Sequence, residues 1–236
     1  MSNYRYTKQN LGQKFEFTLI KQVHLAVNNE EFYIIEDDQN SKFLLLKKQY
    51  LPYHFKIGQK ITCNLDKINC SGQLFFEPEN PYYKVNQCYS FNLIEIKTIE
   101  NYLGFQEKVA LVTDAEGNEQ WIRNANGINS LEFKVDAFVL YIKKGKLFLI
   151  GKECYEKGLR INAIADFKVV DEIVTTRFNP AYILEDLWGN KHAIPKALYS
   201  NYNLKIGQWI KATIQKASSK GFFYIEPLHP HSENDW

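Results

Sequence analysis

Residues 55–61 read Phe-Lys-Ile-Gly-Gln-Lys-Ile, and residues 204–210 read Leu-Lys-Ile-Gly-Gln-Trp-Ile. The two copies lie 149 residues apart (207 − 58), and the same spacing relates positions on both sides of them. The related pairs are Tyr33 with Tyr182, Asp37 with Asp186, Lys42 with Lys191, Tyr50 with Tyr199, Gly72 with Gly221, and Glu77-Pro78 with Glu226-Pro227. Similarity at a fixed spacing indicates a repeated structural unit. The chain therefore contains two copies of one unit.

A degenerate third copy fills the interval between the other two. Its segments, with their counterparts in the first unit, are residues 112–114 (35–37), 133–136 (the Lys-Ile-Gly block) and 145–149 (72–76). In this copy Asp136 stands in the place of the glycine, and the Glu-Pro pair is missing. We therefore predict three units, at residues 1–83, 84–153 and 154–236.

Within each unit the apolar residues follow a period of two, which predicts half-buried strands. This alternation is seen at Phe15, Phe17 and Leu19, at Tyr89, Phe91 and Leu93, and at Ile61, Cys63 and Leu65. Residues 37–41, 114–118 and 186–190 are rich in Asp, Asn and Gly, as hairpin turns require. A connector with two tyrosines follows the third strand. Five strands with this connector predict the OB fold, a five-stranded Greek-key barrel. The expected fold is all-β, with three consecutive small five-stranded OB-like barrels.

The strand that begins at Gly58, the turn at Gly72 and the closing Phe75-Phe76-Glu77-Pro78 strand resemble the second half of RNA-binding OB domains. The closest resemblance is to the domains repeated in tandem in the largest protein of the bacterial small ribosomal subunit. It covers all three units as a pattern and is best in residues 55–78 and 204–227. It implies a bacterial tandem OB-fold protein that binds RNA. The Glu-Pro-x-x-Pro ending resembles that of uncharacterised bacterial OB-repeat proteins.

The composition excludes several classes of protein. Lys and Arg number 29 against 27 Asp and Glu, 45% of residues are hydrophobic, and 24% are charged, which is typical of a folded chain. No apolar run approaches the ~20 residues that a membrane helix needs, and residues 1–5 do not resemble a secretory signal. The irregularly spaced cysteines 63, 70, 88 and 154 form no zinc-type pair, so we expect reduced thiols. These features predict a cytoplasmic protein without a membrane partner.

No catalytic or cofactor motif is present, and we expect no catalytic residues, no metal, no small-molecule cofactor and no enzymatic activity. The five histidines include one close pair, His229 and His231, which is too few for a zinc site. The doublets Asp37-Asp38 and Glu185-Asp186 are interpreted as turn-forming carboxylates. The Glu-Pro pairs are interpreted as strand ends, because proline cannot donate a ladder hydrogen bond. The connector tyrosines are expected to close the barrels as core side chains.

OB folds bind single strands on their second and third strands. Leu45, Ile122 and Ile194 are equivalent and always aliphatic, so this position is expected to point inward. Trp121 and Arg123 then share the outer face of the middle unit, where they could stack on a base and contact a phosphate. The alternative is that Trp121 packs against a neighbouring barrel. The other candidates for nucleic-acid binding are Tyr33, Tyr182, Trp188, Lys42, Lys47, Lys48 and Lys191.

Two functions remain open from the sequence. The first is a non-catalytic protein that binds single-stranded nucleic acid, RNA rather than DNA. The second is a protein-interaction scaffold or adaptor subunit, favoured by the near-neutral charge and the many aromatic residues. An enzyme or a carbohydrate-binding module is a third reading. A pI of about 8.2 is low for a dedicated nucleic-acid binder, so binding would depend on a local basic stripe and on salt.

Overall fold

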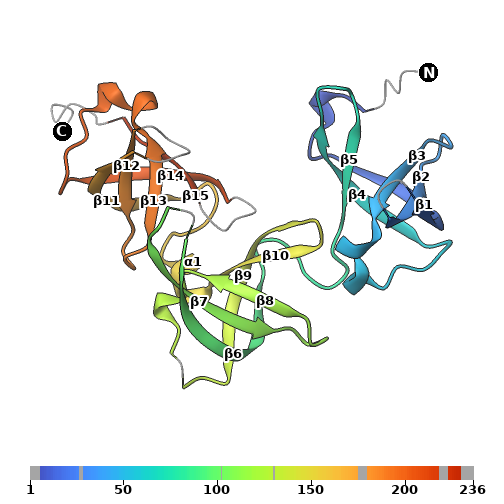
Figure 1. Ribbon diagram of the computed structural model, residues 1–236, viewed down its shortest axis with the longest axis horizontal. Coiled ribbons are helices and arrows are strands. Elements are labelled where there is room, and N and C mark those ends of the chain that lie inside the picture. Colours follow the sequence, from blue (N-terminus) through green and yellow to red (C-terminus); the bar gives the residue numbers. More distant parts are fainter. Residues whose placement is uncertain are drawn as a thin grey trace. The chain divides into compact units, whose positions relative to one another are not determined.

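The computed structural model describes residues 6–26, 29–101, 103–129, 131–174, 180–217 and 223–229. It contains three five-stranded sheets that follow one another along the chain (Figure 1). The first consists of β1 (Lys14–Leu25), β2 (Glu30–Glu36), β3 (Lys42–Leu46), β4 (Lys60–Ile68) and β5 (Leu74–Pro78). The second consists of β6 (Cys88–Glu100), β7 (Gln106–Thr113), β8 (Glu119–Arg123), β9 (Lys134–Lys143) and β10 (Lys146–Gly151). The third consists of β11 (Ile164–Ile173), β12 (Ala181–Glu185), β13 (Lys191–Pro195), β14 (Trp209–Ala217) and β15 (Phe223–Pro227).

Short helices lie between the strands. The 3₁₀ helices of the first unit are η1 (Lys8–Asn10), η2 (Lys47–Gln49) and η3 (Leu51–Tyr53), and those of the third are η5 (Lys196–Leu198) and η6 (Ser200–Tyr202). The middle unit has η4 (Ala125–Gly127) and, after β10, the helix α1 (Lys152–Glu156). No helix among the described residues is long and apolar enough to cross a membrane.

The three sheets share one strand order, which confirms the all-β, OB-like fold predicted from the repeat. In each sheet the first strand pairs with the second and the fourth. In the first and third sheets the third and fifth strands are the outer members. In the middle unit β8 and β10 pair in parallel through Leu149 and Ile122, which closes the barrel. The first strand of each sheet carries a bulge at the same place, after Leu19, Leu93 and Val169. A bulge bends a strand, and this bend lets one strand pair with two neighbours around a barrel.

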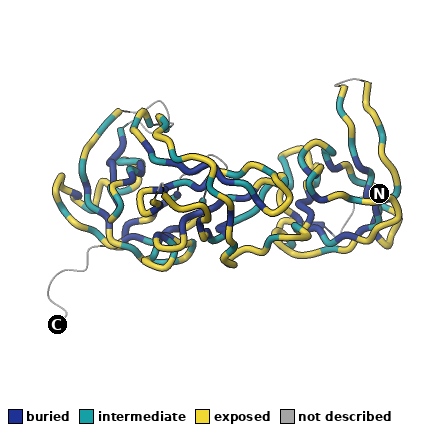
Figure 2. Tube along the Cα trace, turned by 90° about the horizontal axis from the view of Figure 1, so that it is seen from below, coloured by how far each residue is buried: buried dark blue, intermediate teal, exposed yellow. Residues whose placement is uncertain are grey.

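The cores follow from the alternation of buried and exposed residues along the strands, which the colours of Figure 2 mark. Leu45, Ile122 and Ile194 are 3%, 0% and 1% exposed, so the predicted inward position is confirmed. Tyr50 and Tyr53 are buried in the core of the first barrel, as expected of side chains that close it. Cys63 is a buried, free thiol of the same core. The apolar pattern and the comparison of the three units therefore place these side chains correctly.

Contacts divide the chain into two compact units. One contains the residues up to Lys84 together with Ile142–Lys146, the tip of the β9–β10 hairpin. The other contains residues 85–141 and 147–236. Within this second unit, Leu140 and Ile150 of the middle barrel belong to the same core cluster as Phe167 of the third. Ile150 follows Leu149, which pairs with the inward Ile122, so Ile150 points to the outer side of the sheet. Outer-face side chains of the middle barrel therefore pack against the core of the third.

The strand register corrects the sequence alignment of the middle unit. Phe17 pairs with Ile61 in the first barrel, and Phe91 pairs with Val135 in the second. Glu132, three residues before Val135, therefore takes the place of Gly58, and Asp136 does not. The error arose because a short apolar pattern can be shifted against its counterpart when no glycine marks the turn. The turn glycine Gly221, Pro230 and His231 of the tail, and residues 1–5 lie outside the described residues.

Candidate nucleic-acid interface

Trp121 lies on the outer face of the middle barrel, on β8. Its strand partner is Leu111 of β7, and the residue is 39% exposed. The ammonium group of Lys97, from β6, lies 4.7 Å from the centre of the ring. Lys97 also forms an ion pair with Glu95 at 2.7 Å. An exposed indole with a cation above it offers one stacking surface and one positive charge on the strands that OB barrels use for ligands.

Arg123 shares this face with Trp121 but is already paired. Its guanidinium donates two hydrogen bonds to the carboxylate of Glu107 on β7, at 2.6 and 2.5 Å. Glu107 is only 8% exposed. A two-point contact of this kind is the strongest geometry for an arginine and a carboxylate. A phosphate would therefore have to compete with Glu107 for Arg123.

The lysines of the first barrel face carboxylates on the neighbouring strand. Lys42 lies 3.4 Å from Glu36, and Lys47 lies 3.1 Å from Glu31. Lys48 pairs with Glu30. Between these pairs the outer face of β2 and β3 is apolar, with Ile34 opposite Leu44 and Leu44 51% exposed. The pairs neutralise the charges of these three lysines, which therefore offer little free positive charge to a phosphate.

Tyr33 and Tyr182 do not lie on a surface, which corrects the expectation that they contribute to an outer face. They are 4% and 6% exposed and belong to the barrel cores. Tyr33 pairs with the inward Leu45, and Tyr182 pairs with the inward Ile194. Paired residues of adjacent strands point to the same side of a sheet, so both rings must point inward.

The outer face of the third barrel is covered within its own compact unit. Ala181, Ile183 and Ala193 are buried there, and Leu103 and Phe105 from the β6–β7 connection pack against them. The ammonium group of Lys191 lies 4.8 Å from the centre of the Phe105 ring. Trp188 packs on the core, and its carbonyl oxygen accepts a hydrogen bond from the Asn126 side chain at 2.7 Å. The surface of β12 and β13 that a nucleic acid would need is therefore occupied.

The aspartates after the second strands form turns, as predicted. In each unit one carboxylate oxygen of Asp37, Asp114 or Asp186 accepts backbone N–H groups two and four residues later, at 2.8–3.0 Å. All three side chains are buried. They therefore hold hairpins together.

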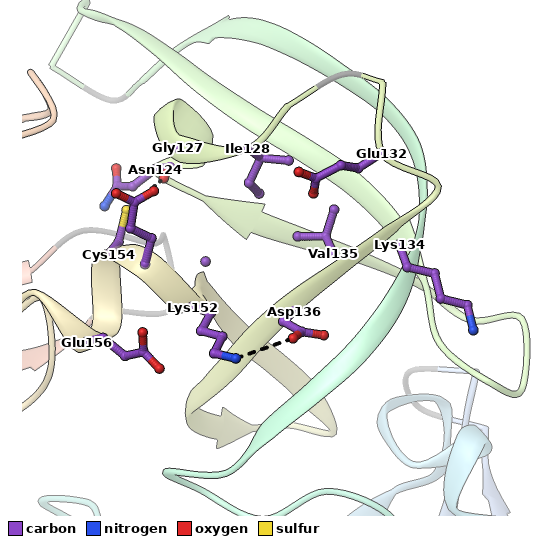
Figure 3. A pocket seen from close by; sticks show the side chains of 12 residues that line it. Asn124, Gly127, Ile128, Glu132, Lys134, Val135, Asp136, Lys152, Cys154 and Glu156 are labelled. Carbon is purple, nitrogen blue, oxygen red and sulfur yellow. Dashed lines mark hydrogen bonds and ion pairs between the residues drawn. The ribbon is translucent and has the colours of Figure 1, made fainter.

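A cavity of about 360 Å³ lies in the middle barrel between η4, the start of β9 and α1 (Figure 3). Its charged lining residues are Glu132, Lys134, Asp136, Lys152, Glu153 and Glu156. Lys152 lies 3.6 Å from Asp136, drawn as a dashed line in Figure 3. Four carboxylates against two lysines give a negative lining, which disfavours phosphate. In the first barrel the corresponding connector carries the buried Tyr50 and Tyr53, and the middle connector has no tyrosine.

Comparison with known proteins gives only distant similarity. No protein-family model and no curated protein matches the chain. A multidomain protein with nucleic acid binding domains from Streptococcus pneumoniae TIGR4 aligns over 95% of this chain and 76% of its own length, at 12% identity and a TM-score of 0.26. The HIN2 domain of tetrameric p202 aligns over 62% of this chain and 96% of its own length, at 12% identity and a TM-score of 0.23. Both TM-scores lie below 0.5, so the fold assignment stands on the sheet topology.

The structure adds residues that the sequence did not single out. Lys97 and Glu107 meet Trp121 and Arg123 only through the pairing of β6, β7 and β8. Glu77, expected only to end a strand, is a buried carboxylate with three hydrogen-bond donors. One signal pointed to it, because Glu77 and Tyr50 recur together as Glu226 and Tyr199. Among the described residues no group of three or more His, Cys, Asp or Glu side chains is arranged to hold a metal ion.

Proposed function

We propose that this protein binds single-stranded nucleic acid on the outer face of β6, β7 and β8 in the middle barrel. The observation that carries the proposal is the half-exposed indole of Trp121 with the Lys97 ammonium group above it. A base stacks on the indole, and Lys97 leaves Glu95 to meet the adjacent phosphate. The resemblance to RNA-binding OB domains favours RNA over DNA. We also propose that the protein is non-catalytic and cytoplasmic.

The middle barrel is the best of the three surfaces for this role. The equivalent face of the third barrel is covered, and that of the first is apolar between neutral ion pairs. With 29 basic against 27 acidic residues, the chain provides little long-range attraction for phosphates. We therefore expect a small number of phosphate contacts and modest, salt-sensitive affinity.

Replacement of Trp121 by alanine is expected to weaken oligonucleotide binding by about tenfold or more, since stacking contributes roughly 1–3 kcal/mol per base. The measurement is fluorescence anisotropy with labelled RNA and DNA of about 12 nucleotides, at about 50 and 200 mM salt. Trp209→Ala is the matched control, because Trp209 is a 55% exposed indole on the third barrel. Equal affinities of the two variants, or no binding by the wild-type chain, would refute the proposal.

Replacement of Glu107 by glutamine tests the role of Arg123. Loss of the carboxylate charge weakens the two-point contact and leaves the guanidinium available to a phosphate. If Arg123 reaches the nucleic acid, affinity should rise by about threefold and its dependence on salt should steepen. The double variant with Arg123→Ala should lose that gain. Unchanged affinity in Glu107→Gln would restrict Arg123 to holding β7 and β8 together.

A second candidate function is a scaffold for another protein. It is favoured by Leu131 and Phe133, which precede β9 and are 83% and 90% exposed. Neighbouring exposed apolar side chains are typical of protein interaction sites. Purification of the tagged chain from its native host should then recover a protein in stoichiometric amount, and the Phe133→Ser variant should lose it. Recovery of nucleic acid alone would contradict this function.

A further inference from the structure

The first barrel holds the tip of a β-hairpin through one buried carboxylate. Glu77, near the end of β5, accepts hydrogen bonds from the backbone N–H groups of Lys144 at 2.7 Å and Gly145 at 3.1 Å. The hydroxyl of Tyr50 donates a third hydrogen bond to it at 3.2 Å. Tip and barrel belong to one compact unit of the chain. Burial raises the pKa of Glu77, and the two N–H groups oppose that shift by favouring the ionised form.

We call the site formed by Glu77, Tyr50 and Tyr53 the receptor of the first barrel. The shape of this receptor selects a narrow class of turn. Lys144 and Gly145 have φ values of 52° and 71°, the left-handed pair of a two-residue type I′ turn. A Cβ on Gly145 would lie 1.9 Å from the carbonyl oxygen of Gln49. Only glycine fits at the second turn position. What Glu77 recognises is therefore a backbone shape, an Xaa-Gly turn that presents two successive N–H groups.

The third barrel carries the same receptor. Glu226 lies opposite Thr213 as Glu77 lies opposite Asn64, at the common spacing of 149 residues. The φ and ψ angles are −126° and 22° at Tyr199 and −121° and 19° at Tyr50. The tyrosine rings of the two connectors have the same centroid distance of 5.5 Å, between Tyr199 and Tyr202 and between Tyr50 and Tyr53. The backbone of the connector and the spacing of its rings thus repeat those of the first barrel, while the angle between the ring planes is 86° in the third barrel and 59° in the first.

The two receptors differ in what covers them. Glu77, Tyr50 and Tyr53 are all buried. Glu226 is exposed, and Tyr199 and Tyr202 are only half-buried. Among the residues that the structure describes, the side-chain amide of Gln215 donates to Glu226 at 2.5 Å, and no backbone N–H group does so. The Glu226 carboxylate can therefore accept further hydrogen bonds, whereas the Glu77 carboxylate already accepts those of the hairpin tip.

We infer that the Glu226 receptor, formed by Glu226, Tyr199 and Tyr202, binds the tip of a β-hairpin with an Xaa-Gly type I′ turn, presented by a partner protein. The two N–H groups of the turn bond to the Glu226 carboxylate. Its glycine lies against the backbone of Leu198, the counterpart of Gln49. In the first barrel Lys143 lies 3.0 Å from Asp66, but Gln215 stands at the position of Asp66. The partner's turn therefore needs no lysine before it.

The test uses a labelled cyclic hairpin peptide that copies residues 140–149, added to the full chain. Binding by fluorescence anisotropy is expected for the wild type and should weaken by about tenfold in Glu226→Gln, whose amide N–H₂ faces the N–H donors of the turn. Tyr199→Phe should have a smaller effect. The matched control is the peptide with alanine in place of its glycine, which should not bind. Glu226 is exposed, so the variant should retain the thermal unfolding of the wild type.

Three outcomes would overturn this inference. The first is no peptide binding by the wild type at about 1 mM, and the second is equal binding by wild type and Glu226→Gln. The third is self-association of the chain in sedimentation velocity that Glu226→Gln abolishes, which would make a second copy the occupant. The inference is independent of the proposed function, since Glu226→Gln should leave oligonucleotide binding unchanged and Trp121→Ala should leave peptide binding unchanged.

Discussion

Replacement of Gly145 by alanine is expected to release the hairpin tip from the first barrel. The added Cβ would lie 1.9 Å from the Gln49 carbonyl oxygen and 3.4 Å from the Tyr50 ring, and the φ of 71° is itself unfavourable for alanine. Together these effects should cost about 3 kcal/mol, roughly a hundredfold in the docking equilibrium. Trypsin should then cleave after Lys143 and Lys144 much faster than in the wild type, because cleavage follows the population of the open form.

Gly72→Ala separates the effect of the steric contact from the effect of the positive φ. Gly72 occupies the corresponding turn of the first barrel with a φ of 80°, but no heavy atom lies within 4 Å of the position of its Cβ. This variant should lose only the free energy that a positive φ costs an alanine, about 1–2 kcal/mol. Its Lys143 and Lys144 sites should stay as resistant as those of the wild type. Equal proteolysis in both alanine variants would show that the Gln49 contact does not hold the tip.

Replacement of Asp186 by alanine is expected to destabilise the third barrel strongly. Its carboxylate accepts hydrogen bonds from the backbone N–H groups of Trp188 and Asn190 and from the side-chain amide of Asn190. It also lies 3.1 Å from Nε2 of His192. Asp186 and His192 are 4% and 3% exposed. Without the carboxylate, the groups that bond to Asp186 would lose their partner inside the barrel. This loss should lower the free energy of unfolding by about 2–4 kcal/mol. Hydrogen exchange at the amides of Trp188 and Asn190 measures this loss.

Asp114→Ala is the matched control in the middle barrel. Asp114 makes the same turn with Glu116 and Asn118. Six residues after it the sequence has Gln120, where the third unit has His192. Its replacement should therefore cost less, by the contribution of the buried imidazole contact. His192 already has one ring nitrogen, Nδ1, that is buried without a hydrogen-bond partner in the described structure. A smaller effect in Asp186→Ala than in Asp114→Ala would show that the histidine does not depend on Asp186.

The alternation of apolar residues determined most of the fold in advance. It predicted the strands. Comparison of the three units predicted the inward position shared by Leu45, Ile122 and Ile194, and the Asp, Asn and Gly residues predicted the turns at the three aspartates. It also contained the information that Tyr33 points inward, because Tyr33 lies at the same parity as Ile35 on β2. Tyr33 was nevertheless named as a candidate for nucleic-acid binding, which requires a side chain on the outer face. Parity decides because side chains alternate strictly between the two faces of a strand.

The sequence by itself determined the repeat, the strands, their turns and most core positions, because these depend on neighbours a few residues away. Only the tertiary structure decided which charged side chains are free. Lys47 and Glu31 meet through the register of β2 and β3, and Arg123 meets Glu107 across β7 and β8. Glu77 finds its partners at Lys144 and Gly145, 67 and 68 residues further along the chain. Contacts over such distances depend on strand register and on how closed sheets bring loops together, and no local pattern encodes them.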